Sequence, residues 1–310
     1  MIDAYSVPPA NWYPRSALAD SNRILSSTYS VRAYEWKHGR RYHSYRAGSY
    51  KFPNDEREQE RLDMRHHVYT RLLGDRLFLA PINPDGMRIL DIGTGTGIWP
   101  IQLYYPSAER IIGNDLSPIQ PQWTPPIVEF LVDDVEQDWV DIQPYDYIHC
   151  RYMAASIRDW PRLVRQCYNN LKPGGWVEFQ DGNPDVYSDD DTLKPDENHV
   201  VQMLRLLSQA CDKVGCTLDP MRSLKRWVQE AGFVNVDERI FKMPMGTWPK
   251  DERLKEIGAF LAMDFIEGVE AFTLVPFTEV LGWSKEEVNA LNEKVRADVM
   301  RKDIHYVFDL

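Results

Sequence analysis

The sequence predicts an α/β fold in which helices cover both faces of a parallel β-sheet. From residue 88 onward, short apolar runs typical of strands alternate with segments of helical periodicity. The first such run, RILDI (88–92), leads into a glycine-rich turn and then into a helix pattern. Alternation of this kind is typical of right-handed βαβ units. With 310 residues, of which 43% are hydrophobic, the chain can bury one large core with a helical appendage.

The elements expected in the first two thirds follow from this alternation. From Asp55 to Leu77 the apolar residues recur at spacings of three and four, with acids in the first turn, which predicts a helix. A helix at 98–105 should follow the glycine turn, and another at 158–171 should end at LKPGG. The five strands expected in this part are 88–92, 110–114, 128–132, 145–150 and 176–180.

The last third combines helices with two further strand patterns. Helices are expected at about 196–214 and 220–231, the second ending at Gly232 as a C-cap. Residues 233–242 alternate as a strand does, and DIHYVFDL (303–310) resembles a last strand. Helical regions at 250–272 and 284–300 separate the two. The chain therefore predicts seven strands, with helices inserted before the last.

Composition excludes several classes of function. The formal net charge is −11, whereas a general nucleic-acid binder needs a basic face, so no direct nucleic-acid partner is expected. No apolar run reaches membrane length and no N-terminal signal pattern occurs, which predicts a soluble protein of the cytoplasm or nucleus without a membrane partner. The four cysteines show no metal-ligand spacing, and we expect them to be thiols in a reducing compartment.

The glycine-rich turn indicates a ligand that approaches the backbone closely. Asp91 precedes Gly93, Thr94, Gly95 and Gly97. A dinucleotide fingerprint would need its third glycine at position 98, which is isoleucine. The D-x-G-x-G-x-G spacing instead resembles motif I of class I S-adenosylmethionine (SAM) methyltransferases. That resemblance implies that Asp91 lies near the methionine ammonium and that the turn packs against the cofactor.

Acids follow the next two strands at the same edge of the expected sheet. Asp115, beside Leu116, can accept hydrogen bonds from both ribose hydroxyls of a nucleoside, although it also fits a turn acid. Asp134 stands where methyltransferases present a carboxylate to the adenine amino group, with the Val135 backbone N–H for a ring nitrogen. Asp133 should point elsewhere, because successive strand residues face opposite sides.

The end of the fourth strand carries the candidate catalytic residues. His149 is the candidate general base, since imidazole titrates near neutral pH, and it is also a candidate cofactor contact. Its alternative is a hydrogen-bonded core histidine. Arg151 shares its face if the strand continues, and it would position an acidic substrate or the cofactor carboxylate. A structural ion pair remains the alternative for Arg151.

Two regions are candidates for closing over such a site. We expect residues 1–54 to form an N-terminal arm and aromatic lid segment, and 55–310 to form the methyltransferase domain. Helices at about 250–300 would form a substrate lid. The aromatic residues could instead pack against the fold. They are Tyr34, Trp36, Tyr42, Tyr45 and Tyr50. The acids at 185–191 favour a solvated loop over a Mg²⁺ site, so no metal is expected.

Segments across most of the chain resemble the fungal LaeA-like methyltransferases of secondary metabolism. Besides the glycine turn, the resemblance rests on GRRYHSYRAGSYKFPNDEREQERLDMRHH (39–67), GNDLSPIQPQWTPP (113–126), DDVEQDW (133–139), IHCRYMAASIRDW (148–160), LKPGGWVEFQD (171–181) and PMGTWPKDERLKEIG (244–258). It implies a Rossmann-like seven-stranded sheet whose last strand is antiparallel and lies between the fifth and sixth. It also implies SAM as cofactor, with S-adenosylhomocysteine as product, and velvet-type protein partners.

Three functions are compatible with these features. The leading prediction is a SAM-dependent methyltransferase that acts on a small secondary-metabolite acceptor in a fungus. The second is a nuclear regulator or protein methyltransferase that works with velvet-type proteins. The third is a SAM-binding scaffold without turnover. Methyl transfer from a sulfonium needs little covalent help from the protein, so the absence of a catalytic triad in the sequence counts against none of them.

Overall fold

A five-stranded parallel sheet forms the centre of the molecule in a computed structural model that describes residues 34–46, 50–139 and 143–310. Its strand order is β5-β4-β3-β6-β7. These strands are β3 (Arg88–Ile92), β4 (Arg110–Asp115), β5 (Val128–Val132), β6 (Tyr145–Arg151) and β7 (Leu171–Gln180). The parallel sheet and all five predicted strands are confirmed.

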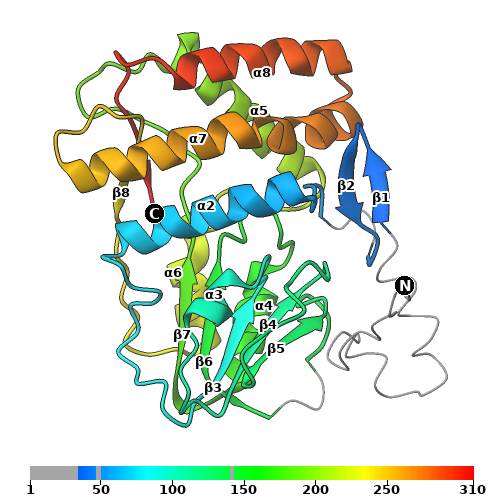
Figure 1. The fold of residues 1–310 in the computed structure, drawn as a ribbon, viewed down its shortest axis with the longest axis vertical. Coiled ribbons are helices and arrows are strands. Elements are labelled where there is room, and N and C mark those ends of the chain that lie inside the picture. The colour runs from blue at the N-terminus through cyan, green and yellow to red at the C-terminus, as the bar shows by residue number, and fades with distance from the viewer. Residues whose placement is uncertain (1–33, 47–49, 140–142) are drawn as a thin grey trace, which may run out of the picture.

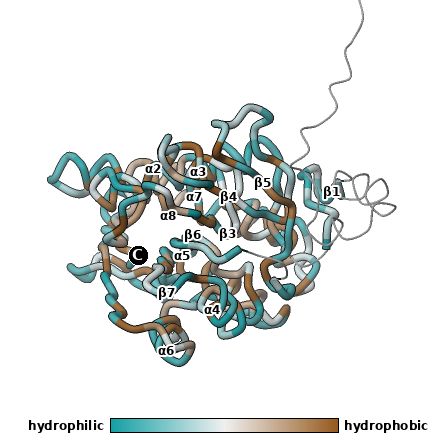
Figure 2. Tube along the Cα trace, turned by 90° about the horizontal axis from the view of Figure 1, so that it is seen from below, coloured by the Kyte–Doolittle hydropathy of each residue, from teal (hydrophilic) through white to brown (hydrophobic). Residues whose placement is uncertain are grey.

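Side chains that alternate along the strands bury both faces of this sheet. Ile89 and Tyr147 face one side and pack with Trp99, whereas Leu90 and Ile148 face the other. Trp99 belongs to the short helix α3 (Ile98–Gln102), and the opposite face is covered by α4 (Trp160–Asn169) and α6 (Met221–Ala231). Figure 2 shows α3 on one side of β3 and β6, with α4 and α6 on the other.

The remaining helices form a separate layer beyond the carboxyl ends of the strands (Figure 1). In this layer α2 packs on α7, α7 on α8, and α5 on α8 and η3. The core of the layer is apolar. The elements are α2 (Glu56–Leu72), η2 (Pro195–Glu197), α5 (His199–Lys213), α7 (Glu252–Val275), η3 (Pro276–Leu281) and α8 (Lys285–Val299).

The predicted seven-stranded sheet is not observed. The last two strands, β8 (Lys242–Met245) and β9 (Tyr306–Asp309), pair antiparallel in a sheet of their own. A bridge between Tyr187 and Val307 links β9 to the chain beyond β7. The last strand, β9, therefore runs antiparallel between β8 and the segment that follows β7, and it does not join the central sheet.

The strand predicted at 233–242 is wrong for residues 233–241. Asn235 adopts a left-handed conformation with φ 56°, which interrupts an extended segment. Val234 and Ile240 remain 80% and 70% exposed, whereas Phe233 and Val236 are half-buried against the core. The C-cap at Gly232, which ends α6 with φ 108°, is as predicted.

The described part of the N-terminal region is a hairpin of β1 (Tyr34–Lys37) and β2 (Arg40–His43). The arm predicted at the start of the chain lies outside the described residues. Trp36 on β1 is 65% exposed, and Tyr45, which follows β2, packs against Val132 of the sheet. Of the five aromatic residues in the predicted lid, only Tyr50 lines the cavity described below. Most of these five aromatic residues therefore pack against the fold or lie at its surface.

Candidate functional site

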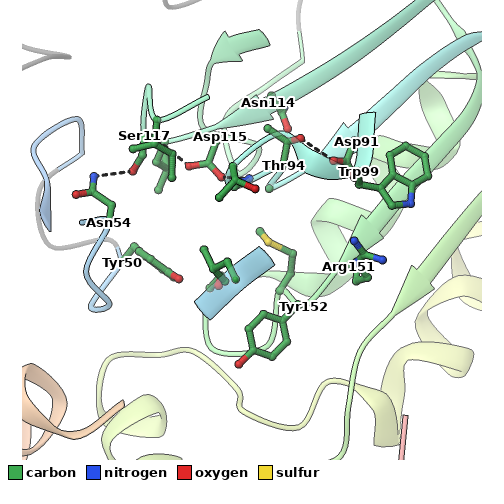
Figure 3. Close-up of a pocket in the computed structure, with 18 of the residues that line it drawn as sticks. Tyr50, Asn54, Asp91, Thr94, Trp99, Asn114, Asp115, Ser117, Arg151 and Tyr152 are labelled. Carbon is green, nitrogen blue, oxygen red and sulfur yellow. Dashed lines mark hydrogen bonds between the residues drawn. The ribbon is translucent and has the colours of Figure 1, made fainter. Parts of the chain in front are cut away.

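A cavity lies between the carboxyl ends of the strands and helix α2 (Figure 3). Open α/β sheets bind ligands along this edge. The walls come from the turn after β3, from the ends of β4, β5 and β6, and from α2. The residues that line it and enter the argument are Tyr50, Leu62, Arg65, His66, Tyr69, Asp91, Gly93, Thr94, Gly95, Trp99, Asp115, Leu116, Asp133, Asp134, Val135, Arg151, Tyr152 and Met153.

The glycine turn forms the floor of the cavity, but Gly95 and Gly97 differ in what surrounds them. Gly95 has φ 56°, and a Cβ placed there would meet only Leu62, at 3.8 Å. Gly97, which begins α3 with φ 79°, is not among the residues that line the cavity, and a Cβ there would run into the Phe130 ring at 2.4 Å. The absence of a side chain at Gly97 is thus needed for packing, and its cofactor contact stays a prediction.

Asp115, at the end of β4, is held by backbone donors. Its carboxylate accepts hydrogen bonds from the N–H of Gly95 at 2.9 Å and of Ser117 at 2.8 Å. Burial raises the pKa of Asp115 to about 6. The carboxylate is thus fixed beside the glycine turn, in the place expected for ribose recognition.

The third strand brings a second acidic group to the cavity. Asp134 and Val135 line it, and Asp134 accepts a hydrogen bond from the Glu136 N–H at 3.0 Å. Their contacts with an adenine stay predictions. Asp133 lines the cavity as well, contrary to the expectation that it points away. The strict alternation of a strand does not apply there, because β5 ends at Val132.

His149 lies behind the cavity wall. It is fully buried, and its ring stacks on Trp99 with 3.9 Å between ring centroids. Its Nδ1 donates to Asp91 Oδ1 at 2.7 Å, and Asp91 Oδ2 accepts from the Thr94 hydroxyl at 2.7 Å. His149 is not among the residues that line the cavity, whereas its two neighbours Trp99 and Asp91 are. This placement favours the alternative of a hydrogen-bonded core histidine, and the roles of His149 as general base and cofactor contact stay predictions.

Arg151, two residues further along the same face, does line the cavity. Its Nη2 contacts Nδ1 of His66 on α2, and its guanidinium lies over the Tyr69 ring at 5.5 Å. His66 Nε2 in turn hydrogen-bonds Gln102 Oε1 at 2.8 Å. Histidine 66, which the sequence pattern alone would place as a packing or surface residue, is therefore part of the site.

Helix α2 forms a wall of the cavity that was not predicted from the sequence. Leu62, Arg65, His66 and Tyr69 all line the cavity from it. Their spacing of three and four residues is the amphipathic signal that predicted the helix, but this spacing does not reveal which partner the face meets. The helices expected at 250–300 as a lid do not line the cavity. Instead α7 packs behind α2.

The residues present fit SAM. The open space above Gly95 admits a ligand against the backbone, and Asp115 offers a carboxylate to hydroxyl groups. Asp134 and the backbone of Val135 stand one strand further on, where a nucleobase would follow the ribose. At the opposite end, Asp91 and Arg151 provide one negative and one positive group. That donor and acceptor set matches an adenosine joined to an amino acid.

Comparison with known proteins agrees with this geometry. Residues 64–238 match a family described as a methyltransferase domain. The chain is 60% identical to the methyltransferase pytC of Aspergillus terreus, over 94% of this chain and 91% of that protein. It is 35% identical to the secondary metabolism regulator laeA of Aspergillus fumigatus, over 87% and 73%. Identity to the protein-methionine methyltransferase laeA of Emericella nidulans is 32%, over 96% and 80%.

These relatives cover most of the chain, and the methyltransferase match covers the strands and turns that build the cavity. The glycine turn, the acids that follow it and the sheet order that brings them together all lie within the matched residues. The chain is therefore a SAM-dependent methyltransferase and belongs to the LaeA-like class I family.

Proposed function

We propose that this methyltransferase transfers the SAM methyl group to a small secondary-metabolite acceptor inside the cavity beneath α2. The observation that carries the proposal is an aromatic wall. Tyr50 before α2, Tyr69 on α2 and Tyr152 after β6 line the same cavity as Asp115. Aromatic walls with a few polar groups are typical of small-molecule sites. The 60% identical relative, pytC, is likewise a methyltransferase.

The chain's own residues have three tasks in this reaction. Asp115 and Asp134 hold the adenosine part, and the glycine turn lets it approach the backbone. Helix α2 and Tyr50 cover the reacting end, which excludes water and orients the acceptor for in-line attack. When bound, SAM supplies an activated methyl group on sulfur, and its transfer to the acceptor leaves S-adenosylhomocysteine.

A protein acceptor is the second candidate. It is favoured by the relative named protein-methionine methyltransferase laeA, which is 32% identical over 96% of this chain. The family resemblance adds velvet-type proteins as partners and the nucleus as location for this candidate. A third alternative is a scaffold that binds SAM without turnover, in which the cofactor would stabilise the fold by linkage.

The test uses SAM that carries tritium on the transferable methyl group. Purified protein is incubated with fungal extract, and label is counted separately in the organic-soluble and the acid-precipitated protein fractions. The control is a Gly95→Asp variant, in which a charged side chain occupies the open space above the turn. Enzyme-dependent label in the organic fraction supports the small-molecule acceptor. Label confined to protein would replace it with the second candidate, and no label with retained SAM binding would favour the scaffold.

A further inference from the structure

Three tyrosine hydroxyls line one part of the cavity, and among the described residues none of them has a hydrogen-bond partner. They belong to Tyr50, Tyr69 and Tyr152, and we call this part the acceptor end. Figure 3 shows the Tyr50 hydroxyl turned toward the side of the cavity where Tyr152 lies. Burial raises the pKa of Tyr50 and of Tyr69, so both phenols keep their protons at physiological pH. A protonated phenol without a protein partner can donate to a ligand.

Tyr152 reaches the acceptor end because the chain turns sharply after β6. Its backbone has φ 58°, which is strained for an aromatic residue. Asp181 holds this turn, since its Oδ2 accepts hydrogen bonds from the N–H of Met153 at 2.7 Å and of Ala154 at 2.8 Å. Strain of this kind persists only where the surrounding structure imposes it, and it is common at ligand sites. The turn therefore indicates a functional role for the Tyr152 side chain.

Arg65, which lines the cavity from α2, adds a fourth donor beside the Tyr152 ring. Its guanidinium carbon lies 4.9 Å from the centre of that ring, and its Nη2 contacts Asp264 of α7. The Nε of Arg65 is buried and has no partner among the described residues. Arg61 donates to Asp264 at 2.7 Å and to Glu58 at 2.7 Å, so two cations and two anions balance in this network. The network thus adds an N–H donor but no net charge.

His66 is the imidazole that lines the cavity from α2, and both of its ring nitrogens are engaged. Nε2 hydrogen-bonds Gln102 Oε1 at 2.8 Å, and Nδ1 contacts Nη2 of Arg151. Burial, together with the neighbouring charge of Arg151, lowers the pKa of His66 to about 4. The carboxylates of the cavity come from β3, β4 and the segment after β5, and they are Asp91, Asp115, Asp133, Asp134 and Glu136. The described groups of the acceptor end therefore donate hydrogen bonds rather than take up a proton.

We propose that the acceptor is an oxygen anion that is already ionised at neutral pH, a carboxylate or an acidic enol, held by Tyr50, Tyr69, Tyr152 and Arg65. The inference rests on the proposed function and specifies its substrate class. A lone pair of the anionic oxygen attacks the methyl carbon, so that the O–C bond forms while the S–C bond breaks and its electron pair passes to sulfur. No proton leaves the acceptor, so hydrogen-bond donors that orient the oxygen are sufficient. The product is a methyl ester or an enol methyl ether.

The first test degrades the organic product that the wild-type protein labels in fungal extract with methyl-tritiated SAM. Equal portions are treated with mild alkali, which hydrolyses methyl esters, with mild acid, which hydrolyses enol ethers, or with neutral buffer. Label released as methanol is distilled and counted. We expect most of the enzyme-dependent label to become volatile, in alkali for a carboxylate acceptor and in acid for an enol. Label that stays in the organic product under both treatments, as in an N-methyl, C-methyl or phenol ether product, overturns the inference and leaves the proposed function intact. Absence of enzyme-dependent label from the organic fraction overturns both.

The second test removes one donor and keeps its ring. In Tyr152→Phe we expect methyl transfer to the organic fraction to fall about tenfold, as loss of one hydrogen bond to an anion would give. Calorimetry should find S-adenosylhomocysteine bound as by the wild-type protein, which shows that the variant is folded and that the loss concerns the acceptor. The matched control is Tyr104→Phe, at a 41% exposed tyrosine after α3 and outside the cavity wall, which should leave transfer unchanged. A Tyr152→Phe protein with wild-type transfer overturns the assignment of this hydroxyl to the acceptor.

Discussion

We expect Asp115 to make the affinity for the nucleoside depend on pH. Ordinary aspartate titrates near pH 4, whereas burial raises the pKa of Asp115 to about 6. Between these values the folded protein holds a proton that the unfolded chain has lost. The contribution of this group to stability therefore falls as pH rises from about 4 to 6, and the cost of burying the charge is fully present above that window.

Ribose recognition needs the ionised carboxylate, so we expect affinity to have the opposite pH dependence. S-adenosylhomocysteine should bind with constant affinity above about pH 7 and lose up to about tenfold per pH unit below pH 6. Calorimetric titrations from pH 5 to 8 measure this directly. An Asp115→Asn variant should bind more weakly and show no such slope. If the affinity of this variant still falls below pH 6, another group is responsible for the pH dependence.

A comparison of Gly95 with Gly86 tests whether the glycine-rich turn binds the cofactor. Gly95 and Gly86 have φ 56° and 66°, and a Cβ meets no atom closer than 3.8 Å at the first and none within 4 Å at the second. An aspartate at either position should cost about 1 kcal/mol of stability for its left-handed backbone. Only Gly95→Asp places a charge in the cavity, and it should weaken S-adenosylhomocysteine binding by about 100-fold or more.

For each variant we would measure the dissociation constant for S-adenosylhomocysteine and the free energy of unfolding. Gly86→Asp should bind as the wild-type protein does while losing similar stability. Equal affinity in the two variants would show that the ligand does not approach the turn.

His149 is expected to act through Asp91. His149→Ala removes the donor to Asp91 Oδ1 and leaves a space beside Trp99, which should cost about 2 to 4 kcal/mol of stability and weaken S-adenosylhomocysteine binding. In His149→Asn the amide nitrogen can replace Nδ1, so binding and methyl transfer should largely recover. Unfolding in urea and the tritium assay measure both properties. An asparagine variant that binds normally but transfers no label would restore the general-base interpretation.

At the scale of single residues, the sequence was informative where function lies within one strand and its turn. Asp91 and Asp115 lie at the carboxyl ends of β3 and β4, and Gly95 lies in the turn after β3, so local pattern was sufficient to place them at one edge. His149 shows the limit, because it shares a face with Arg151 as predicted, but Trp99 from the next helix covers it. The contact between Trp99 and His149 is a tertiary contact, and the spacing of residues in the sequence does not predict it.

Helices α2 and α7 are joined by buried charges whose loss should be costly. Asp264 is fully buried and binds both Arg61 and Arg65. Asp264→Ala leaves two buried guanidinium groups with one carboxylate, Glu58, and we expect a loss of about 3 to 5 kcal/mol in unfolding free energy. Guanidinium chloride unfolding, followed by circular dichroism, measures the change.

Glu267 on the same helix is the matched control for Asp264. It pairs with Arg57 at the surface, where the two side chains are 48% and 41% exposed. Solvent screens such a pair, so Glu267→Ala should change stability by no more than about 1 kcal/mol. Equal losses in both variants would mean that the buried network does not hold the two helices together.

At the scale of elements, periodicity located helices and central strands but not their partners. The strand ends of β3 and β5 match the prediction to the residue, because buried apolar runs there end in acids and glycines. The segment after Gly232 has equally good alternation, and its Phe233 and Val236 pack against the apolar core, but it does not form a strand before Lys242. Pairing of β8 with β9 joins segments more than fifty residues apart, which no local pattern encodes.

The sheet with its covering helices and the helical layer, as the described residues form them, meet at the cavity. The sheet supplies the acids and the glycine turn, and the helical layer supplies α2 (Figure 1). Contacts between them include the short pair of Arg151 with His66 and the hydrogen bond of the Thr96 hydroxyl to Asp63 at 2.6 Å. A ligand in the cavity would touch both layers, so its binding energy should stabilise their association as well as each part.

We therefore expect S-adenosylhomocysteine to slow amide hydrogen exchange in α2 as well as at the ends of β3 and β4. At a free concentration of 100 times the dissociation constant, linkage adds about 2.7 kcal/mol to the stability of the bound form. Helix α6, which packs on α4 behind the sheet and contributes no cavity residue, serves as the internal control and should change least in local opening. Mass spectrometry of exchanged peptides resolves these segments. Protection confined to the strand ends, with α2 unchanged, would mean that the helix is a passive cover and that the acceptor side of the site is organised without it.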